Sequence, residues 1–351
     1  MRILITGNMG YVGPVLVRHL RARFPDASLI GYDNGYFAHC LTSEEDTPET
    51  LLESQLIGDV RELPAALLKD VDAVVHLAAI SNDPMGNRFE APTREINFGS
   101  TVAIAEAARN AGVRSYVFAS SCGVYGAANG RARRETDDVE PLTAYARSKI
   151  DAERQLRQME LEPMTVTCLR FATACGMSPR LRLDLVLNDF VACALADGTI
   201  TVLSDGTPWR PLIDVTDMAR AIEWAVLRGT GNGGAFLTVN AGSDAGNCQM
   251  VKLAEAVADN IPGTRVSINR KAPPDRRSYR VDFSLFQTLA PEFTPQVTLA
   301  QSIASVRDGL AATGFSDAQF RNSQHMRLKA LESLLAAGRL GADLRWAAPL
   351  R

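Results

Sequence analysis

Residues 6–13, Thr-Gly-Asn-Met-Gly-Tyr-Val-Gly, decide the fold of this chain. They follow an apolar run at residues 3–5 and lead into a helical pattern that begins at Val12. Glycines at positions 7, 10 and 13 allow a tight turn, a close approach of the backbone to a diphosphate, and close packing of helix on strand. The free amides and the dipole at the helix start favour negative charge. This segment therefore predicts a dinucleotide-binding loop made by Gly7, Met9, Gly10, Tyr11 and Val12.

Short apolar runs alternate with helical patterns through the first half of the chain. The runs are apolar throughout, as expected for strands that helices cover on both faces. The alternation predicts an α/β fold with a Rossmann-type, doubly wound parallel sheet. The expected strands are 3–6, 29–32, 54–57, 73–77, 115–119 and 166–171, and the expected helices are 12–24, 63–68, 96–111, 144–159, 185–196, 215–227 and 317–337.

The second half of the chain has a looser pattern, and proline and glycine become frequent after about residue 170. A length of 351 residues predicts about two domains. We expect a dinucleotide-binding Rossmann domain at 1–169, to which segments around 212–250 return. Residues 170–211 and 251–351 are expected to form a smaller substrate-binding lobe.

The composition argues against several classes of protein. Hydrophobic residues make up 46% and charged residues 22%, and the formal net charge is −3. This balance disfavours a nucleic-acid binder or a polybasic membrane binder. No apolar run is long enough to span a membrane, and the first residues do not resemble a signal peptide. Six cysteines and four histidines show no metal-ligand spacing, so we expect reduced thiols, no metal site and a cytoplasmic protein.

The ends of the second, third and fourth expected strands carry further cofactor signals. Asp33 can accept hydrogen bonds from both ribose hydroxyls of NAD and would repel the 2′-phosphate of NADP, and residues 34–37 contain no Lys or Arg. Asp59 either accepts from the adenine amino group or simply leads a helix, whereas His76 is interpreted as a core residue. The predicted cofactor is NAD, and the residues expected to bind it here are Asp33, Asn34, Asp59, Val60, Leu77, Ala78 and Ala79.

Ser121, Tyr145 and Lys149 are the candidate catalytic residues. Ser121 follows the fifth expected strand, at the carboxyl edge of the sheet where ligands bind. Tyr145 and Lys149 are four residues apart on an expected helix, so they share one helix face. An ammonium near a phenol lowers the phenol pKa, which predicts that Tyr145 acts as a general base.

This ordered set of motifs resembles the extended short-chain dehydrogenase/reductase family, in its nucleotide-sugar epimerase/dehydratase branch. The resemblance covers about residues 1–310 and implies that Ser121 orients a sugar hydroxyl, Tyr145 moves its proton, and Lys149 also holds the nicotinamide ribose. It adds Asn97, Ala119 and Phe171 to the expected cofactor residues. It also implies a homodimer formed through the helices at 96–111 and 144–159.

The second lobe resembles the family more loosely. The implied substrate-binding residues are Ser81, Ser121, Thr173, Asn188, Arg210 and Arg277, of which Arg210 would meet the substrate phosphates. Pro211 stands where the family has an acid, and Ala272 stands where a late Arg-Pro-Gly-Asp segment, here 274–282, would begin with Arg. Which basic residue meets phosphate is therefore left open.

Cys122 and Gly123 bear on the reaction. The family's 4,6-dehydratases carry an Asp-Glu pair at this place, and Gly123 has no side chain, so an elimination lacks one partner. The simplest fitting reaction is NAD-dependent epimerisation of a nucleotide-diphosphate sugar, at C4, through a transient keto intermediate. A dehydratase or decarboxylase of the same family, and a catalytically silent NAD-binding sensor protein, are the alternatives.

Overall fold

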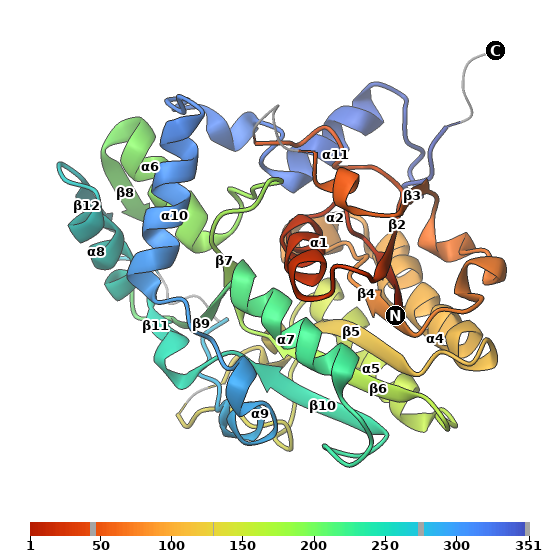
Figure 1. Ribbon diagram of the computed structural model, residues 1–351. Helices are drawn as coiled ribbons and strands as arrows, with labels where there is room; N and C mark the ends of the chain where they lie inside the picture. The colour runs from red at the N-terminus through yellow and green to blue at the C-terminus, as the bar shows by residue number, and fades with distance from the viewer. Residues whose placement is uncertain (43–46, 129, 273–276, 348–351) are drawn as a thin grey trace.

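Seven parallel strands form the central sheet, in the order β10-β6-β5-β4-β1-β2-β3 (Figure 1). The computed structural model describes residues 1–42, 47–128, 130–272 and 277–347. The switch in strand order between β1 and β4 opens a crevice at the carboxyl ends of the strands, where such folds bind ligands. The strands are β1 (Arg2–Thr6), β2 (Ser28–Asp33), β3 (Ser54–Ile57), β4 (Ala73–His76), β5 (Ser115–Ser121), β6 (Thr165–Phe171) and β10 (Phe236–Ala241).

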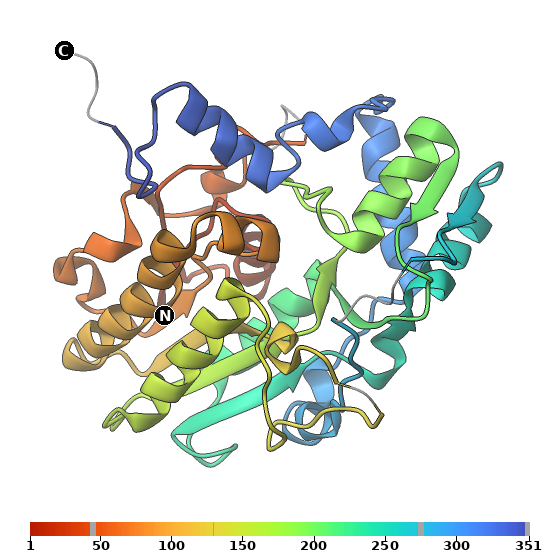
Figure 2. The same cartoon turned by 180° about the vertical axis from the view of Figure 1, so that it is seen from behind.

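Helices cover both faces of this sheet, as the apolar strands predict. Ile3 and Ile5 of β1 belong to the core beneath α1 (Val12–Arg23) and α7 (Val215–Leu227). Leu4 between them points to the other face, where α4 (Ser100–Asn110) and α5 (Ala144–Gln158) lie side by side (Figure 2). The Rossmann-type α/β fold is therefore confirmed.

Some expected elements differ from the structure. The strand at 54–57 and the helix at 215–227 have the predicted bounds. The stretch expected as a helix at 63–68 forms only a 3₁₀ turn, Ala65–Leu68, after Pro64. A π-helical turn, Glu95–Gly99, precedes α4, and the short helices α2 (Asp83–Arg88) and α3 (Glu90–Arg94) were not expected.

The smaller lobe follows β6 and has its own core. Its elements are β7 (Thr173–Cys175), α6 (Val186–Asp197), β8 (Thr199–Val202), β9 (Trp209–Asp214), β11 (Asn247–Gln249), α8 (Met250–Asn260), β12 (Arg265–Ile268) and α10 (Leu299–Ala312). Between β9 and β11 the chain returns to the central sheet, because α7 packs on α1 and β10 extends the sheet beyond β6. The helix α9 (Ser284–Leu289) lies beside β10.

The last part of the chain differs most from the sequence-based division. The expected helix at 317–337 is limited to α11 (Arg327–Ala336), because the Ser323 hydroxyl accepts from the His325 amide and holds a turn before it. Leu331 and Leu344 lie in the same core as Leu4 of the central sheet. Residues 327–347, assigned above to the substrate lobe, therefore pack on the nucleotide-binding half, beside α2 (Figure 1), whereas Phe320 stays in the core of the smaller lobe.

Two expectations from composition have counterparts in the structure. All six cysteines are free, and five of them are buried. Across the described ranges, no helix combines the length and the apolar character needed to cross a membrane.

Candidate active site

The glycine loop between β1 and α1 is shaped by close backbone contacts. Gly7 has a φ of +75°, and a Cβ at this position would lie within 3 Å of the Ala78 backbone at the end of β4. A Cβ at Gly13 would overlap the backbone of Asn8. Only glycine fits at both places, and the loop leads directly into α1, whose N-cap residue Tyr11 makes no side-chain cap hydrogen bond. This cradle fits a dinucleotide diphosphate.

Asp33 ends β2 at the wall of the same crevice. Its carboxylate accepts from the amides of Met9 at 3.0 Å and Gly35 at 2.8 Å, which fixes its orientation. Burial raises its pKa, and the two amides act in the opposite direction. A buried, oriented carboxylate beside the glycine loop fits the ribose of NAD.

A single cavity of about 1170 Å³ connects the cofactor side with the second lobe. It is lined by most of the residues expected from the sequence: Gly7, Gly10, Tyr11, Val12, Asp33, Asn34, Val60, Leu77, Ala78, Ala79, Ser81, Ala119, Ser121, Tyr145, Lys149, Phe171, Thr173, Arg210 and Arg277. Residues 274–276, which precede Arg277, lie outside the described residues.

Four expected residues do not line the cavity: Met9, Asp59, Asn97 and Asn188. The Asp59 carboxylate is held by the Arg61 guanidinium at 2.6 Å, which lowers its pKa against the effect of burial. Asn97 is buried and its amide group bonds to both backbone atoms of Ile80, so it fixes the loop after β4.

Asn188 differs most clearly from its expected role at the substrate diphosphate. Its side chain is buried and accepts from the Gly176 amide at 3.1 Å, while its amide nitrogen donates to the Arg182 carbonyl at 2.9 Å. The side chain of Asn188 is therefore hydrogen-bonded to the backbone of the loop before α6, and it stabilises this loop behind the cavity.

Ser121, Tyr145 and Lys149 come together on one wall of the cavity. Ser121 is the last residue of β5, and its hydroxyl accepts from the Gly123 amide at 3.0 Å. The first turn of α5 carries Tyr145, which hydrogen-bonds Ser121. Lys149, one turn later, donates to the Ala119 carbonyl at 2.8 Å, and its Nζ lies 5.7 Å from the centre of the Tyr145 ring.

The pKa values at this wall differ from the expectation that Lys149 brings Tyr145 towards neutrality. Burial raises the pKa of Tyr145 to about 12, and the hydrogen bond with Ser121 opposes this. Burial also lowers the pKa of Lys149 to about 7, with the Glu153 carboxylate acting in the opposite direction. Desolvation outweighs the charge on the lysine here, because both side chains are enclosed by the fold.

Cys122 and His76 lie behind the wall of the cavity. The Cys122 thiol is fully buried and donates to the Arg170 carbonyl at 3.0 Å, and burial raises its pKa well above the usual range. His76 bonds to the hydroxyls of Thr6 and Thr101, and burial lowers its pKa to about 3. Neither side chain lines the cavity.

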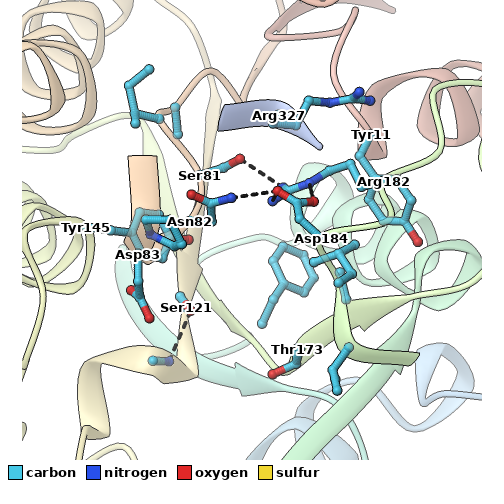
Figure 3. Close-up of a pocket in the computed structure, with 18 of the residues that line it drawn as sticks. Tyr11, Ser81, Asn82, Asp83, Ser121, Tyr145, Thr173, Arg182, Asp184 and Arg327 are labelled. Carbon is cyan, nitrogen blue, oxygen red and sulfur yellow. Dashed lines mark hydrogen bonds and ion pairs between the residues drawn. The ribbon is translucent and has the colours of Figure 1, made fainter. Parts of the chain in front are cut away.

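The structure adds a polar cluster that sequence reasoning missed. Arg182 donates to both carboxylate oxygens of Asp184 and to the Ser81 hydroxyl, and Asn82 donates to Asp184 at 2.6 Å (Figure 3). The cluster faces Tyr145 across the cavity (Figure 3). The only signal in the sequence is the alternation of charged and apolar residues at 180–184, in a segment without regular structure.

Comparisons with known proteins agree with this geometry. The sequence profile of the NAD dependent epimerase/dehydratase family matches residues 3–242. The UDP-glucose 4-epimerase of Mycolicibacterium smegmatis is 30% identical over 322 residues, which cover 87% of this chain and 96% of that protein.

Solved structures give the same result. MoeE5 in complex with UDP-glucose and NAD is 26% identical, with a TM-score of 0.72, and the match covers 89% of this chain and 99% of that chain. TunA, described as an NAD-dependent NDP-hexosamine 5,6-dehydratase, shares the fold at 23% identity, with a TM-score of 0.76 over 89% of this chain and 98% of that chain.

The matched stretch contains the glycine loop, Asp33, Ser121, Tyr145 and Lys149. The glycine cradle and the buried carboxylate of Asp33 fit the cofactor of this family. The chain therefore belongs to the NAD dependent epimerase/dehydratase family, whose members are enzymes that use NAD.

Proposed function

We propose that this protein is an epimerase that inverts C4 of a nucleotide-diphosphate sugar through a transient keto intermediate. One observation carries the proposal: Ser121, Tyr145 and Lys149 share one wall of a cavity that extends from the glycine loop to Arg210 and Arg277. Bound NAD supplies the hydride acceptor and donor for such a reaction.

The side chains at this wall are suited to move one proton. In the proposed reaction the Tyr145 oxygen takes the proton of the C4 hydroxyl as its own phenolic proton passes to the neutral amine of Lys149. Ser121 holds the C4 oxygen by a hydrogen bond. Lys149 has a pKa of about 7, so its amine and ammonium forms are both accessible near neutrality and it can pass the proton on. After the keto sugar has rotated and the hydride has returned to the other face of C4, Tyr145 returns the proton to the C4 oxygen.

Arg210 and Arg277 are proposed to receive the substrate phosphates. Both line the end of the cavity formed by the second lobe. The Arg210 guanidinium lies 5.6 Å from the centre of the Tyr279 ring, and Arg277 contacts Asp83 at 2.9 Å across the cavity. Guanidinium groups held in this way favour a diphosphate.

The surroundings of Ser121 favour epimerisation over dehydration. An elimination needs an acid beside the reacting sugar, but Gly123 has no side chain and Cys122 is buried, with its thiol bonded to the backbone. A decarboxylase would need only oxidation at C4, and it is the main alternative within the family. The presence of Ser121, Tyr145 and Lys149 together argues against a silent NAD-binding sensor.

Similar proteins support the substrate class. The relative from Mycolicibacterium smegmatis is named a UDP-glucose 4-epimerase, and the MoeE5 structure holds UDP-glucose with NAD. These names favour a uridine diphosphate sugar and chemistry at C4 as the first combination to test.

The test is incubation of the NAD-loaded protein with a panel of UDP- and dTDP-sugars, followed by mass spectrometry and proton NMR of the products. The proposal expects a product of unchanged mass whose C4 proton has changed its coupling pattern. Loss of water would identify a dehydratase, and loss of carbon dioxide a decarboxylase. Bound NAD without turnover of any sugar would favour the sensor.

We also propose that the protein is a homodimer that pairs through α4 and α5. The two helices lie side by side on one face of the sheet (Figure 2). Ala103 of α4 is exposed. Ile150 and Leu156 of α5 are buried in the core of their own chain, so the paired surface would consist of the outer faces of the helices.

A further inference from the structure

Residues 327–347 lie outside the stretch that the family profile matches, yet they pack against the cofactor end of the cavity. The segment contains α11, which begins at Arg327, and a final turn at residues 341–345. Figure 1 shows it in blue beside the edge of the sheet formed by β2 and β3.

The final turn holds the loop that follows Asp33. Trp346 donates from its indole nitrogen to the Asn34 carbonyl at 2.7 Å. The Tyr36 hydroxyl donates to the Leu344 carbonyl, and the rings of Tyr36 and Trp346 lie 5.8 Å apart. Because Asn34 and Tyr36 both line the cavity, this turn fixes the wall on the adenosine side.

The same turn holds the loop after β3. Arg61, which pairs with Asp59, also donates to the Asp343 carbonyl at 2.8 Å. Arg345 forms an ion pair with Glu62. Both loops expected to receive the adenosine half of NAD are therefore tied to the carboxyl-terminal segment.

Arg327 brings a buried positive charge to this wall. Its side chain is 1% exposed, lines the cavity, and lies 5.0 Å from the centre of the Phe37 ring. Among the residues that the structure describes, the guanidinium donates only to carbonyl groups, those of Gln324, Arg180 and Leu181. A buried charge with carbonyl partners alone is costly unless an anion compensates it.

The neighbouring charges compensate the Arg327 charge only in part, because Asp184 acts on it without forming an ion pair with it. Arg180 is paired with Glu49, and Arg182 with Asp184. Within the described part of the chain, no carboxylate lies at ion-pair distance from Arg327. Burial lowers the pKa of Arg327 to about 10, with Cys40 and Asp184 acting to raise it and Arg182 and Arg180 acting to lower it, so the guanidinium remains charged at neutral pH.

The position of Arg327 favours the cofactor over the substrate as the source of the anion. Arg327 lies on the same side of the cavity as Tyr11 of the glycine loop, away from Ser121 and Thr173 (Figure 3). Residues 34–37, Asn-Gly-Tyr-Phe, contribute no cation of their own. The second lobe already supplies Arg210 and Arg277 at the substrate end.

We propose that residues 327–347 are a cofactor-retaining element, in which Arg327 pairs with the diphosphate of bound NAD while the turn around Trp346 fixes the adenosine-side loops. The proposal depends on NAD being the cofactor. Such an element suits an enzyme that regenerates its cofactor in every cycle, because NAD then has no need to leave.

The first test compares Arg327→Gln with Lys329→Gln, which removes an exposed charge from the same helix. Binding of NAD, ADP and UDP to each purified, cofactor-free protein is measured by titration calorimetry. Loss of a hydrogen bond to a charged group weakens binding about tenfold or more. We expect this loss for NAD and ADP in Arg327→Gln, unchanged affinity for UDP, and unchanged affinities in Lys329→Gln.

The second test follows the release of NAD from Trp346→Ala, a variant of a partly exposed side chain that leaves the core intact. Removal of one aromatic contact is expected to speed release about threefold or more, as measured by stopped-flow displacement with excess ADP-ribose. Lys329→Gln should release NAD at the rate of the unmodified protein.

The outcomes separate this proposal from the assignment of the cofactor. If the unmodified protein fails to bind NAD, the cofactor itself is wrong. If it binds NAD and Arg327→Gln binds NAD equally well, only the retaining role is overturned, and weaker binding of UDP instead would move Arg327 to the substrate. Where Arg327→Gln does not fold, Arg327→Lys, which keeps the charge but loses the planar fork, must weaken NAD and ADP binding and spare UDP.

Discussion

Replacement of Lys149 by methionine should stabilise the fold while abolishing activity. Lys149 is 2% exposed, and burial lowers its pKa from 10.5 to about 7. Each tenfold change in proton affinity is worth about 1.36 kcal/mol, so keeping this lysine charged in the folded protein costs roughly 5 kcal/mol. Methionine has a similar length and carries no charge, so the Lys149→Met protein avoids this cost.

Part of this gain in stability is offset, because the substitution also removes the hydrogen bond made by the lysine amine. Lys149 donates to the Ala119 carbonyl at 2.8 Å, and methionine leaves that carbonyl buried without this donor. An unsatisfied buried group costs about 1–3 kcal/mol. The free energy of unfolding should therefore rise by about 2 kcal/mol near neutral pH, an instance of stability gained where function is lost.

The stability difference between Lys149→Met and the unmodified protein should depend on pH. Below pH 7, Lys149 is charged in both the folded and the unfolded chain, so the cost of burial is fully present. Between pH 7 and 10.5 the folded chain has lost the proton that the unfolded chain still holds, so the stability of the unmodified protein rises with pH. The advantage of Lys149→Met should be largest below pH 7 and should shrink through this window.

Urea unfolding of both cofactor-free proteins, at about pH 6 and about pH 9.5, measures this advantage. Lys329→Met is the matched control, because Lys329 is exposed on α11 and should give no gain at either pH. A Lys149→Met protein that is less stable at the lower pH, or whose advantage grows with pH, would refute the reasoning.

Three further predictions concern the proposed reaction, the cofactor and the assembly. Tyr145→Phe should lower the rate of NAD reduction by an active sugar about 10²–10⁴-fold, while NAD binding survives. Ser121→Ala should also lower this rate, with little change in NAD affinity. Both rates are measured in a single turnover from the absorbance of the reduced nicotinamide. The unmodified protein should bind NAD about tenfold more tightly than NADP, or more, and Asp33→Ala should reduce this difference because the carboxylate that repels a 2′-phosphate is gone. Equal affinities of the unmodified protein for NAD and NADP, measured by calorimetry, would contradict this prediction. Sedimentation at micromolar concentration should show a dimer, whereas a monomer alone would overturn the pairing through α4 and α5.

The sequence predicts the nucleotide-binding half well because its signals are local. The glycine spacing at 7, 10 and 13 constrains the turn itself, and the strands of the central sheet are buried on both faces, so their apolar runs mark them clearly. Tyr145 and Lys149 follow from helical spacing within α5. None of these inferences needs a partner from a distant part of the chain.

Features that depend on tertiary contacts could not be predicted in this way. Arg182 and Asp184 meet Ser81 and Asn82 only because the loop before α6 folds back over β4. The pKa of Tyr145 depends on how completely the fold encloses it, and that burial reverses the direction expected from Lys149 alone.

The position of the carboxyl-terminal segment also depends on tertiary contacts that the sequence does not reveal. Its leucines at helical spacing indicate an amphipathic helix, but not which surface the helix covers. For Asn188 the sequence suggested a contact with the diphosphate, but in the structure its side chain hydrogen-bonds the backbone of Gly176 and Arg182 within its own lobe.

One measurement tests the central claim, that the chain inverts C4 of a nucleotide sugar with its own bound NAD. UDP-glucose carrying deuterium at C4 is incubated with the NAD-loaded protein in ordinary water, and the product is examined by NMR and mass spectrometry. The account predicts the C4 epimer, with deuterium still at C4 and no change in mass, because the hydride removed from the sugar returns to it. A product that has lost deuterium or water, or a fully NAD-loaded protein that turns over no nucleotide sugar, would contradict it.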